Sequence, residues 1–473
     1  MKPLKRSLCL LLASLMLLSF ASCSKNEADD EKDKTVETSG DWEIDFSDKN
    51  YEGYEFTVLR ADIETAHGLQ GYPNDIWVEE LSGDVLGNAV YNRNLQLAEM
   101  LNVTIKLTLF EQGAKLTNEL EKNTTSGSTP YDLTVLNIRG FPTLIEKGLV
   151  KDMNELELDT SYSWWDKDAE NALNIAGKQY AMISDITYVD RLNTVGVFVN
   201  STMAADIGLP DLYAMVDNGE WTWAKMKEFA VMAAESGEEI YGISAQNDFS
   251  YYMMHAANIQ TVSKDNSGNL VYKLPYQRPV TILQDIYTVM NENYFFNRQL
   301  DGDLSIDDTV KMFGTKNLFL VRPLTTFYFM KNYYDDYGIL PTPKMDDVYE
   351  GYYSSIAHHA ATLMAVPINN AENARTADVL QAWGMISEKV VNPEFYGKIL
   401  STRMVTDSNG SRMLDIIFEN RVYDTGLMFN LGGVESVVLK KTNALMERAP
   451  GSVGSDISSL KVSVEKAIEE FLK

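Results

Sequence analysis

The side chains most often used for covalent chemistry are scarce in this 473-residue chain. Its only cysteines are Cys9 and Cys23, so the chain beyond residue 23 has no thiol for a disulfide, a thiolate metal site or a nucleophile. No GxSxG elbow is present, and Gly432-Gly433 is too short for a phosphate-binding loop. The 68 Asp and Glu residues guarantee pairs that imitate a glycosidase dyad, but the sequence cannot single one out. We therefore predict no catalytic residue.

The histidines also lack a chemical pattern. There are four of them: His67, His255, His358 and His359. None lies in an HExxH motif, a Cys/His zinc pattern or an EF-hand loop, so we interpret each as a buried or surface residue without partners. We predict no metal and no cofactor.

Tyrosine doublets occur three times, at Tyr251-Tyr252, Tyr333-Tyr334 and Tyr352-Tyr353. Adjacent tyrosines chelate ferric iron in some bacterial binding proteins. In a chain with 25 tyrosines, however, doublets at a lobe surface or stacked against a ligand are the interpretation that we favour.

The charge balance excludes one large class of partners. With 41 Lys and Arg against 68 Asp and Glu, the formal net charge is −27. Nucleic-acid binding needs a basic surface that displaces condensed counterions, and anionic membranes repel so acidic a chain. The composition, 45% hydrophobic and 23% charged, is that of a globular protein, and the length suggests roughly two to four folding units.

The N-terminal sequence predicts that the protein is exported. Lys2, Lys5 and Arg6 precede an apolar run over 7–21 that is too short for a transmembrane helix and typical of a secretory signal. The run ends in Phe20-Ala21-Ser22-Cys23, which resembles a lipoprotein signal, with Phe20 in place of the usual leucine. We expect residues 1–22 to be removed and Cys23 to carry lipid; the alternative is a simple signal peptide cut near Ala21.

Residues 23–50 are predicted to form a disordered tether. The segment from Ser24 to Asn50 holds ten acids and four lysines, and almost no aliphatic residues. Such a composition cannot bury enough apolar surface to fold.

Downstream, the hydrophobic period alternates between strand and helix. We predict strands at 54–59, 103–109, 133–138, 180–183, 195–199, 241–244 and 318–321. Helices are predicted after Asp84 to Leu101, near 114–122 and 142–147, from Trp223 behind the N-cap Thr222, and over 457–471. Alternating β and α units favour an α/β fold with mostly parallel sheets covered by helices.

A series of short phrases then resembles one family. They are Tyr131–Leu136 followed by 144–153, Gly177–Tyr180, Val197–Asn200, Glu220–Trp223 and Tyr337–Pro341. Their order and spacing are similar to those of bacterial extracellular solute-binding proteins, the lipoprotein substrate-binding subunits of ABC importers, of the carbohydrate-binding type that includes maltose-binding protein.

The resemblance implies a two-lobed periplasmic-binding-protein fold of type II, with hinge strands and a ligand cleft between the lobes. The first lobe is expected at 51–186 plus 350–393 and the second at 187–349 plus 394–473. The chain should cross between them near 184–190, 343–353 and 392–395.

Because open α/β sheets bind ligands beyond the carboxyl ends of their strands, the resemblance also implies a set of ligand contacts. We expect them at Arg60, Asp62, Asn137, Arg139, Ser184, Asp185, Asn247, Asp248, Phe249, Tyr252, Arg322, Phe327 and Tyr328. Carboxylates, amides and guanidinium groups bond sugar hydroxyls, and aromatic faces cover the C–H side of a sugar ring. Trp221 and Trp223 are expected in the core.

The function that this family implies is capture of a small polar ligand, a sugar or oligosaccharide, by lobe closure and its delivery to the membrane subunits of an ABC permease. We expect a monomer, not an enzyme, that is anchored outside the cytoplasm by its N-terminal lipid. Two alternatives stay open: a surface glycan hydrolase with a carboxylate pair in the cleft, and a binder of peptide or another non-sugar solute.

Overall fold

The computed structural model describes residues 42–61, 75–110, 113–299, 301–302, 304–330, 337–357, 360–401, 408–434 and 453–471. The signal segment, Cys23, Asp62 and most of the predicted tether lie outside these ranges, as do the side chain of Arg139 and three of the four histidines, His67, His358 and His359.

The first sheet has the order β14-β3-β1-β2, from Thr362–Ala365, Leu133–Asn137, Tyr54–Ala61 and Val103–Phe110. β1 pairs in parallel with β2 and β3, whereas β14 returns from much later in the chain and is antiparallel to β3. The predicted strands at 54–59, 103–109 and 133–138 are therefore present within one or two residues.

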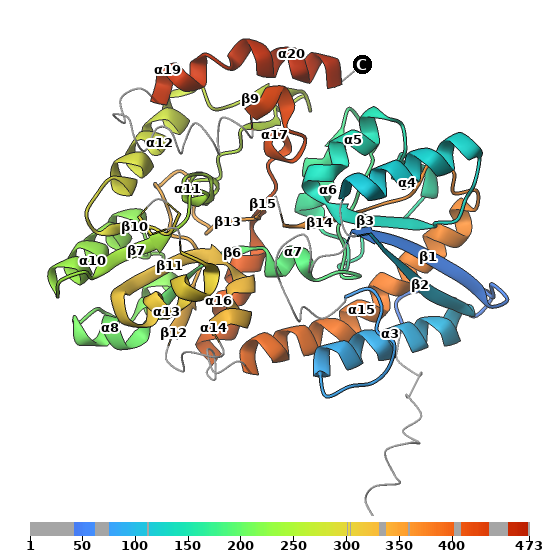
Figure 1. The fold of residues 1–473 in the computed structure, drawn as a ribbon, viewed down its shortest axis with the longest axis horizontal. Helices are drawn as coiled ribbons and strands as arrows, with labels where there is room; N and C mark the ends of the chain where they lie inside the picture. Colours follow the sequence, from blue (N-terminus) through green and yellow to red (C-terminus); the bar gives the residue numbers. More distant parts are fainter. Residues whose placement is uncertain are drawn as a thin grey trace, which may run out of the picture. The chain divides into compact units, whose positions relative to one another are not determined.

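Helices cover this sheet. α3 (Val85–Leu101) begins at the N-cap Asp84, whose carboxylate accepts from the backbone N–H of Gly87 at 2.9 Å, and it packs against the long α15 (Asn373–Ser401). Figure 1 shows α3 and α15 on one side of the sheet, with α4 (Gly113–Ser126) and α5 (Phe141–Glu146) on the other. We call this sheet, its helices, α6 (Lys167–Leu173) and the short η1 (Ile138–Gly140), η2 (Met153–Leu156) and β4–β5 (Asn174–Ile175, Lys178–Gln179) the first lobe.

The second sheet has the order β10-β7-β11-β6-β12, from Phe295–Asn297, Tyr241–Ala245, Asn317–Pro323, Val195–Asn200 and Tyr337–Leu340. β7 is parallel to β10 and β11, but β6 is antiparallel to β11 and β12. All six residues of β6 are buried, as expected for a strand covered on both faces.

The second lobe comprises this sheet, the hairpin β8–β9 (Val262–Lys264, Leu270–Tyr272) and their helices. These are α8 (Ser201–Asp206), α9 (Leu212–Asp217), α10 (Trp223–Glu235), α11 (Phe249–Ala256), α12 (Gln277–Met290), α13 (Ile306–Lys316), η3 (Leu324–Thr326), α14 (Phe327–Met330), α16 (Ser408–Glu419), α17 (Thr425–Met428), η4 (Leu431–Gly433), α19 (Val453–Ser458) and α20 (Lys461–Phe471). α10 begins at the predicted N-cap Thr222, and both Trp221 and Trp223 are buried.

The chain passes between the sheets along three segments. The first contains α7 (Val189–Leu192) and leads into β6. The second, between β12 and β14, holds β13 (Ser354–Ser355), which pairs in parallel with β15 (Arg421–Val422). For the third, Asn392–Phe395 lies inside α15 and not in a hinge strand, because the helical pattern continues through Pro393. The lobe boundaries given above remain predictions.

Three other expectations need correction. Residues 180–183 form only an isolated bridge, Met182 with Met364, because this extended stretch has no longer partner strand. The C-terminal helix is two helices, α19 and α20. The predicted tether covers residues 23–50, but its last residues belong to the folded part of the chain, because Phe46 is buried and Lys49 pairs with Asp378 at 3.0 Å.

Within the described ranges, no helix combines the length and the apolar character needed to cross a bilayer.

Candidate functional site

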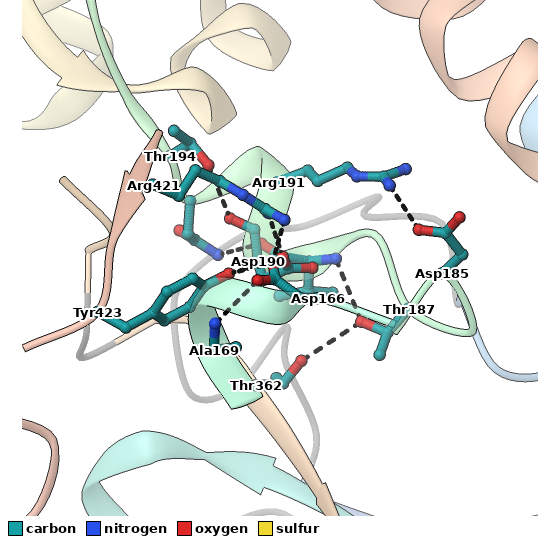
Figure 2. A network of polar contacts seen from close by, with 12 residues as sticks. Asp166, Ala169, Asp185, Thr187, Asp190, Arg191, Thr194, Thr362, Arg421 and Tyr423 are labelled. Atoms are coloured by element: carbon teal, nitrogen blue, oxygen red, sulfur yellow. Dashed lines mark hydrogen bonds and ion pairs between the residues drawn. The ribbon is translucent and has the colours of Figure 1, made fainter. Parts of the chain in front are cut away.

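Arg421 of β15 connects the second lobe to the first. Its guanidinium is ion-paired with Asp166, immediately before α6, and lies 2.5 Å from Asp190 of α7. Tyr423 adds a hydroxyl that donates to Asp166 at 2.8 Å. Figure 2 shows Arg421 and Tyr423 pointing toward the two carboxylates. One buried cation thus holds a first-lobe helix and a crossing segment together.

The electrostatics of this network follow from its burial. Burial alone would lower the pKa of Arg421, but the charge of Asp166 and further negative partners raise it well above its usual range. Desolvation raises the pKa of Asp190, and Arg421 opposes that shift. Because the guanidinium stays charged, the network keeps its ion pairs at neutral pH.

A second polar triangle fixes the first crossing to α15. Arg191 lies 2.5 Å from Asp185 and donates to the side-chain oxygen of Asn392 at 2.8 Å, and Asn392 donates to Asp185 at 2.7 Å. Burial raises the pKa of Asp185 to about 6, despite the opposing charge of Arg191. The contact of Arg191 with Asp185 is drawn in Figure 2.

A cavity of about 430 Å³ adjoins Arg421, and we call it the main cavity. Its walls come from α6 of the first lobe, from the segment 258–264 of the second lobe, and from β15 with the segment around β13. The lining residues are Asp168, Asn171, Ala172, Asn258, Gln260, Ser263, Lys264, Tyr353, Asn420, Arg421, Val422, Tyr423 and Thr425.

The positions of these walls follow from local structure. The carboxylate of Asp166 caps α6 by accepting from the backbone N–H of Ala169 at 2.9 Å, so the residue that holds Arg421 also sets the start of this helix. Across the main cavity, Thr425 donates to the backbone oxygen of Ala172 at 2.9 Å, and Lys264 donates to that of Asn171. The two lobes are therefore in contact at its edge.

The lining of the main cavity is chemically suited to a polyhydroxylated ligand. It offers the amides of Asn171, Asn258, Gln260 and Asn420 as donors and acceptors, and the ring of half-buried Tyr353. Asp168 is its only carboxylate among the described residues; desolvation and then the charge of Asp166 raise its pKa. Amides can bond hydroxyl groups, and the tyrosine ring offers an aromatic surface beside them.

Of the predicted ligand contacts, those in the first lobe lie apart from this cavity. Arg60 is buried in an ion pair with Asp75, and Ser184 is buried and accepts from the backbone N–H of Ile186 at 3.2 Å. Asn137 caps η1 and lines a different cavity of about 410 Å³ on the first lobe.

In the second lobe, the structure gathers part of the predicted set around Gln246. At the carboxyl ends of β7 and β11, this amide donates to Asp248 at 2.5 Å and accepts from Arg322 at 2.7 Å. Tyr252 is fully buried, with its hydroxyl 3.5 Å from Asp248. Burial lowers the pKa of Arg322 to about 10, helped by the nearby charge of Arg298.

The remaining members are spread over the lobe. Asn247 accepts from the amide of Asn297 at 2.9 Å, whereas Phe249 and Phe327 are buried in the core. Tyr328 is half-buried on α14, and burial followed by the charges of Asp84 and Asp75 raises the pKa of its hydroxyl. None of the predicted contacts that the structure describes lines the main cavity, and as ligand contacts all of them remain predictions.

Sequence reasoning missed the residues that line the main cavity. A signal did exist at β15, where the polar Arg421 and Tyr423 alternate around the buried Val422. Polar residues at every second position of a short strand mark a face turned toward a polar space.

His255 is buried, as interpreted, but it has two partners. Its Nδ1 lies 2.7 Å from the hydroxyl of Ser355 and its Nε2 3.2 Å from Asp424. All three residues are buried and none of them lines the main cavity, so the chain of contacts fastens α11 to β13 and to the segment before α17.

Comparisons with known proteins agree with this architecture. Residues 96–319 match the family model described as bacterial extracellular solute-binding protein. No curated protein matches the chain by sequence. Similar solved structures include a sugar transporter of Rhizobium etli in an open conformation, with 16% identity, a TM-score of 0.59, and coverage of 86% of this chain and 99% of that one.

Two others carry bound ligands. UgpB of Mycobacterium tuberculosis, in complex with glycerophosphocholine, has 14% identity and a TM-score of 0.57 over 89% of this chain and 99% of that one. An ABC transporter solute-binding protein of Thermotoga lettingae, bound with α-D-tagatose, has 12% identity and a TM-score of 0.56 over 88% and 100%. The family match and the shared two-lobed fold confirm the resemblance of this chain to the bacterial extracellular solute-binding proteins.

Proposed function

We propose that this protein captures a sugar or short oligosaccharide between its lobes and releases it intact to an ABC permease. One observation carries the proposal: a polar cavity is lined by the first lobe, by the second lobe with β15, and by Tyr353 of the crossing segment next to β13. A ligand in the main cavity contacts both lobes only when they are closed, so binding shifts the equilibrium between open and closed lobes toward the closed state.

The bound ligands of similar structures support the ligand class. Among them, the protein from Thermotoga lettingae is described with α-D-tagatose and one from Bifidobacterium animalis with β-1,6-galactobiose. UgpB, with glycerophosphocholine, keeps a non-sugar polar solute as the second candidate. The amide-rich lining with a tyrosine ring favours the sugar.

A thermal-shift screen of the mature protein against neutral and acidic oligosaccharides tests the proposal. A ligand at 100 times its dissociation constant adds about 2.7 kcal/mol to stability, which raises the melting temperature measurably. Tyr353→Ala should weaken the best hit by about tenfold, because the variant loses a ring face in the main cavity. Tyr91→Ala, a half-buried tyrosine of α3 that does not line this cavity, is the matched control.

The hydrolase alternative requires different residues in the same cavity. A glycosidase needs two carboxylates that flank the scissile bond, and the described lining provides Asp168 alone. Incubation with labelled oligosaccharides separates the two functions, since stoichiometric capture without product supports the binder and turnover supports the enzyme.

We also propose that the protein lies outside the cytoplasm and is anchored to the membrane by a lipid. The matched family is extracellular, which supports a place outside the cytoplasm. Attachment through a lipid on Cys23 rests on the N-terminal sequence and is tested by metabolic labelling with a fatty-acid probe, which Cys23→Ser should abolish. Deletion of the permease genes nearest in the genome should abolish uptake of the ligand but not its binding.

A further inference from the structure

A second cavity, of about 410 Å³, lies beside the main one, and we call it the side cavity. The two have four lining residues in common: Asn258, Gln260, Ser263 and Lys264. The segment 258–264 therefore faces both cavities.

The side cavity is lined by three cations, Lys264, Lys273 and Arg278, and by no carboxylate among its described lining residues. This is the reverse of the chain as a whole, in which 68 acidic residues outnumber 41 basic ones. Of the three, Arg278 has a carboxylate partner within the described ranges, Asp346 at 2.8 Å, whereas Lys264 donates to the backbone oxygen of Asn171. Hydrogen bonds to the carboxylate of Asp265 lower its pKa and the charge of Lys273 lowers it further, but neither Lys273 nor Lys264 forms an ion pair with a carboxylate among the described residues.

Aromatic rings stand next to these cations. Tyr276 and Tyr349 both line the side cavity and are 55% and 38% exposed, which is unusual for side chains with so much apolar surface. Lys273 lies 5.8 Å from the ring centre of Tyr276, and Arg278 lies 5.4 Å from that of Tyr349. Each exposed ring therefore has a cation at its side.

The rings also connect the two cavities. Tyr349 of the side cavity contacts Tyr353 of the main cavity, with ring centres 5.4 Å apart and planes at 67°. An aromatic surface therefore runs from one cavity to the other. A row of sugar rings finds C–H contacts along it, with amides at one end and cations at the other.

We propose that the ligand is an acidic glycan, whose neutral sugar occupies the main cavity and whose negatively charged group lies in the side cavity near Lys264, Lys273 and Arg278. The inference rests on the proposed function and specifies its ligand class. A carboxylate or a sulfate ester on the glycan satisfies the same cations through charge-assisted hydrogen bonds. A neutral glycan offers no charged partner to Lys264 and Lys273.

The test is calorimetric titration of the mature protein with an array of oligosaccharides in matched sets. Each set has a neutral member, such as galactobiose or xylotriose, its uronate-bearing counterpart, and a counterpart with a sulfate ester. In the set whose sugars the protein binds, we expect a uronate or sulfate counterpart to bind about tenfold more tightly than the neutral oligosaccharide. Raising sodium chloride from about 50 to about 500 mM should reduce that preference, because salt screens charges at a half-exposed site.

Lys273→Gln provides the decisive variant, since its ammonium lines the side cavity without a carboxylate partner among the described residues. This variant should lose most of the preference for the acidic member and keep its affinity for the neutral one. Lys466→Gln is the control and should change neither affinity, because Lys466 is an exposed lysine of α20 that pairs with Glu470 in the same helix.

The outcomes are distinct. Uronate or sulfate preference that Lys273→Gln removes supports the inference, and the stronger of the two counterparts identifies the acidic group. A neutral member that binds as tightly as its acidic counterparts overturns the inference but leaves the proposed function standing. If no member of any set binds, the proposed function falls, and the inference with it.

Discussion

At the scale of residues, Arg421 forms two buried ion pairs at the junction of the lobes. It faces Asp166 and Asp190, whose side chains are 7% and 3% exposed. A buried pair is expensive to break, because the partners left behind are uncompensated charges in a poorly solvated environment.

We therefore predict that Arg421→Gln lowers the free energy of unfolding by about 3 to 5 kcal/mol. Arg412→Gln is the matched control, since Arg412 pairs with Asp217 at 2.7 Å where both side chains are well exposed, and its loss should stay below about 1 kcal/mol. Urea denaturation measures both. Similar losses in the two variants would show that the buried pairs contribute no more than a surface pair.

Asp185 gives a prediction about pH. Its pKa is raised to about 6, above the ordinary value of 3.8 that the unfolded chain has. Between these values the folded protein binds more protons than the unfolded one, so this group adds stability as the pH falls from about 7 to about 4. At higher pH the buried charge opposes folding.

The expected result is that the stability of the wild type relative to Asp185→Asn rises as the pH is lowered through that window. Unfolding free energies of both proteins at several pH values measure it. A difference between them that does not change with pH would show that Asp185 titrates near its unfolded value.

Residue roles were the hardest part to predict from sequence. Arg322, Asp248 and Tyr252 lie close together near the amide of Gln246, but their role as ligand contacts stays a prediction. Arg421 and Asp166 are 255 positions apart in the sequence, and no local sequence pattern predicts a contact between them. Such pairs arise only when two lobes and a crossing strand assemble.

At the scale of elements, helix α15 contains two glycines in opposite environments. A Cβ on Gly384 would lie 2.4 Å from Cδ1 of Trp164, whereas a Cβ on Gly397 would meet nothing within 4 Å. Gly384 allows the helix to approach the buried indole of Trp164, while Gly397 only adds flexibility to an exposed turn of helix.

We predict that Gly384→Ala destabilises the protein by about 1 to 3 kcal/mol through overpacking. Gly397→Ala, in the same helix, should stabilise it by about 0.5 to 1 kcal/mol, because alanine loses less backbone entropy in a helix than glycine does. Thermal denaturation gives both signs. A stable Gly384→Ala variant would mean that α15 does not fix the position of Trp164.

Elements with a strong local signal were predicted well. The strands at β1, β2 and β3 and the caps of α3 and α10 follow from alternation and from Asp84 and Thr222, which act within a few residues. The pairing of β14 with β3 and of β13 with β15 was not predicted, because these short strands owe their existence to partners far away in the chain.

At the scale of the whole molecule, binding and lobe closure are one equilibrium. Contacts across the main cavity, such as Thr425 with Ala172, exist only when the lobes touch. A ligand that bridges the same walls adds to them, and a shift of populations from 1:99 to 99:1 requires about 5.5 kcal/mol of differential affinity. A few charge-assisted hydrogen bonds and a covered ring are enough to supply it.

Small-angle scattering of the mature protein, titrated with the oligosaccharide that calorimetry finds to bind, measures whether binding closes the lobes. The radius of gyration should fall as the ligand is added, with the same midpoint as the heat of binding, and chromatography should then recover the oligosaccharide uncut. Binding without any compaction, or recovery of cleaved sugar, would contradict the proposed function.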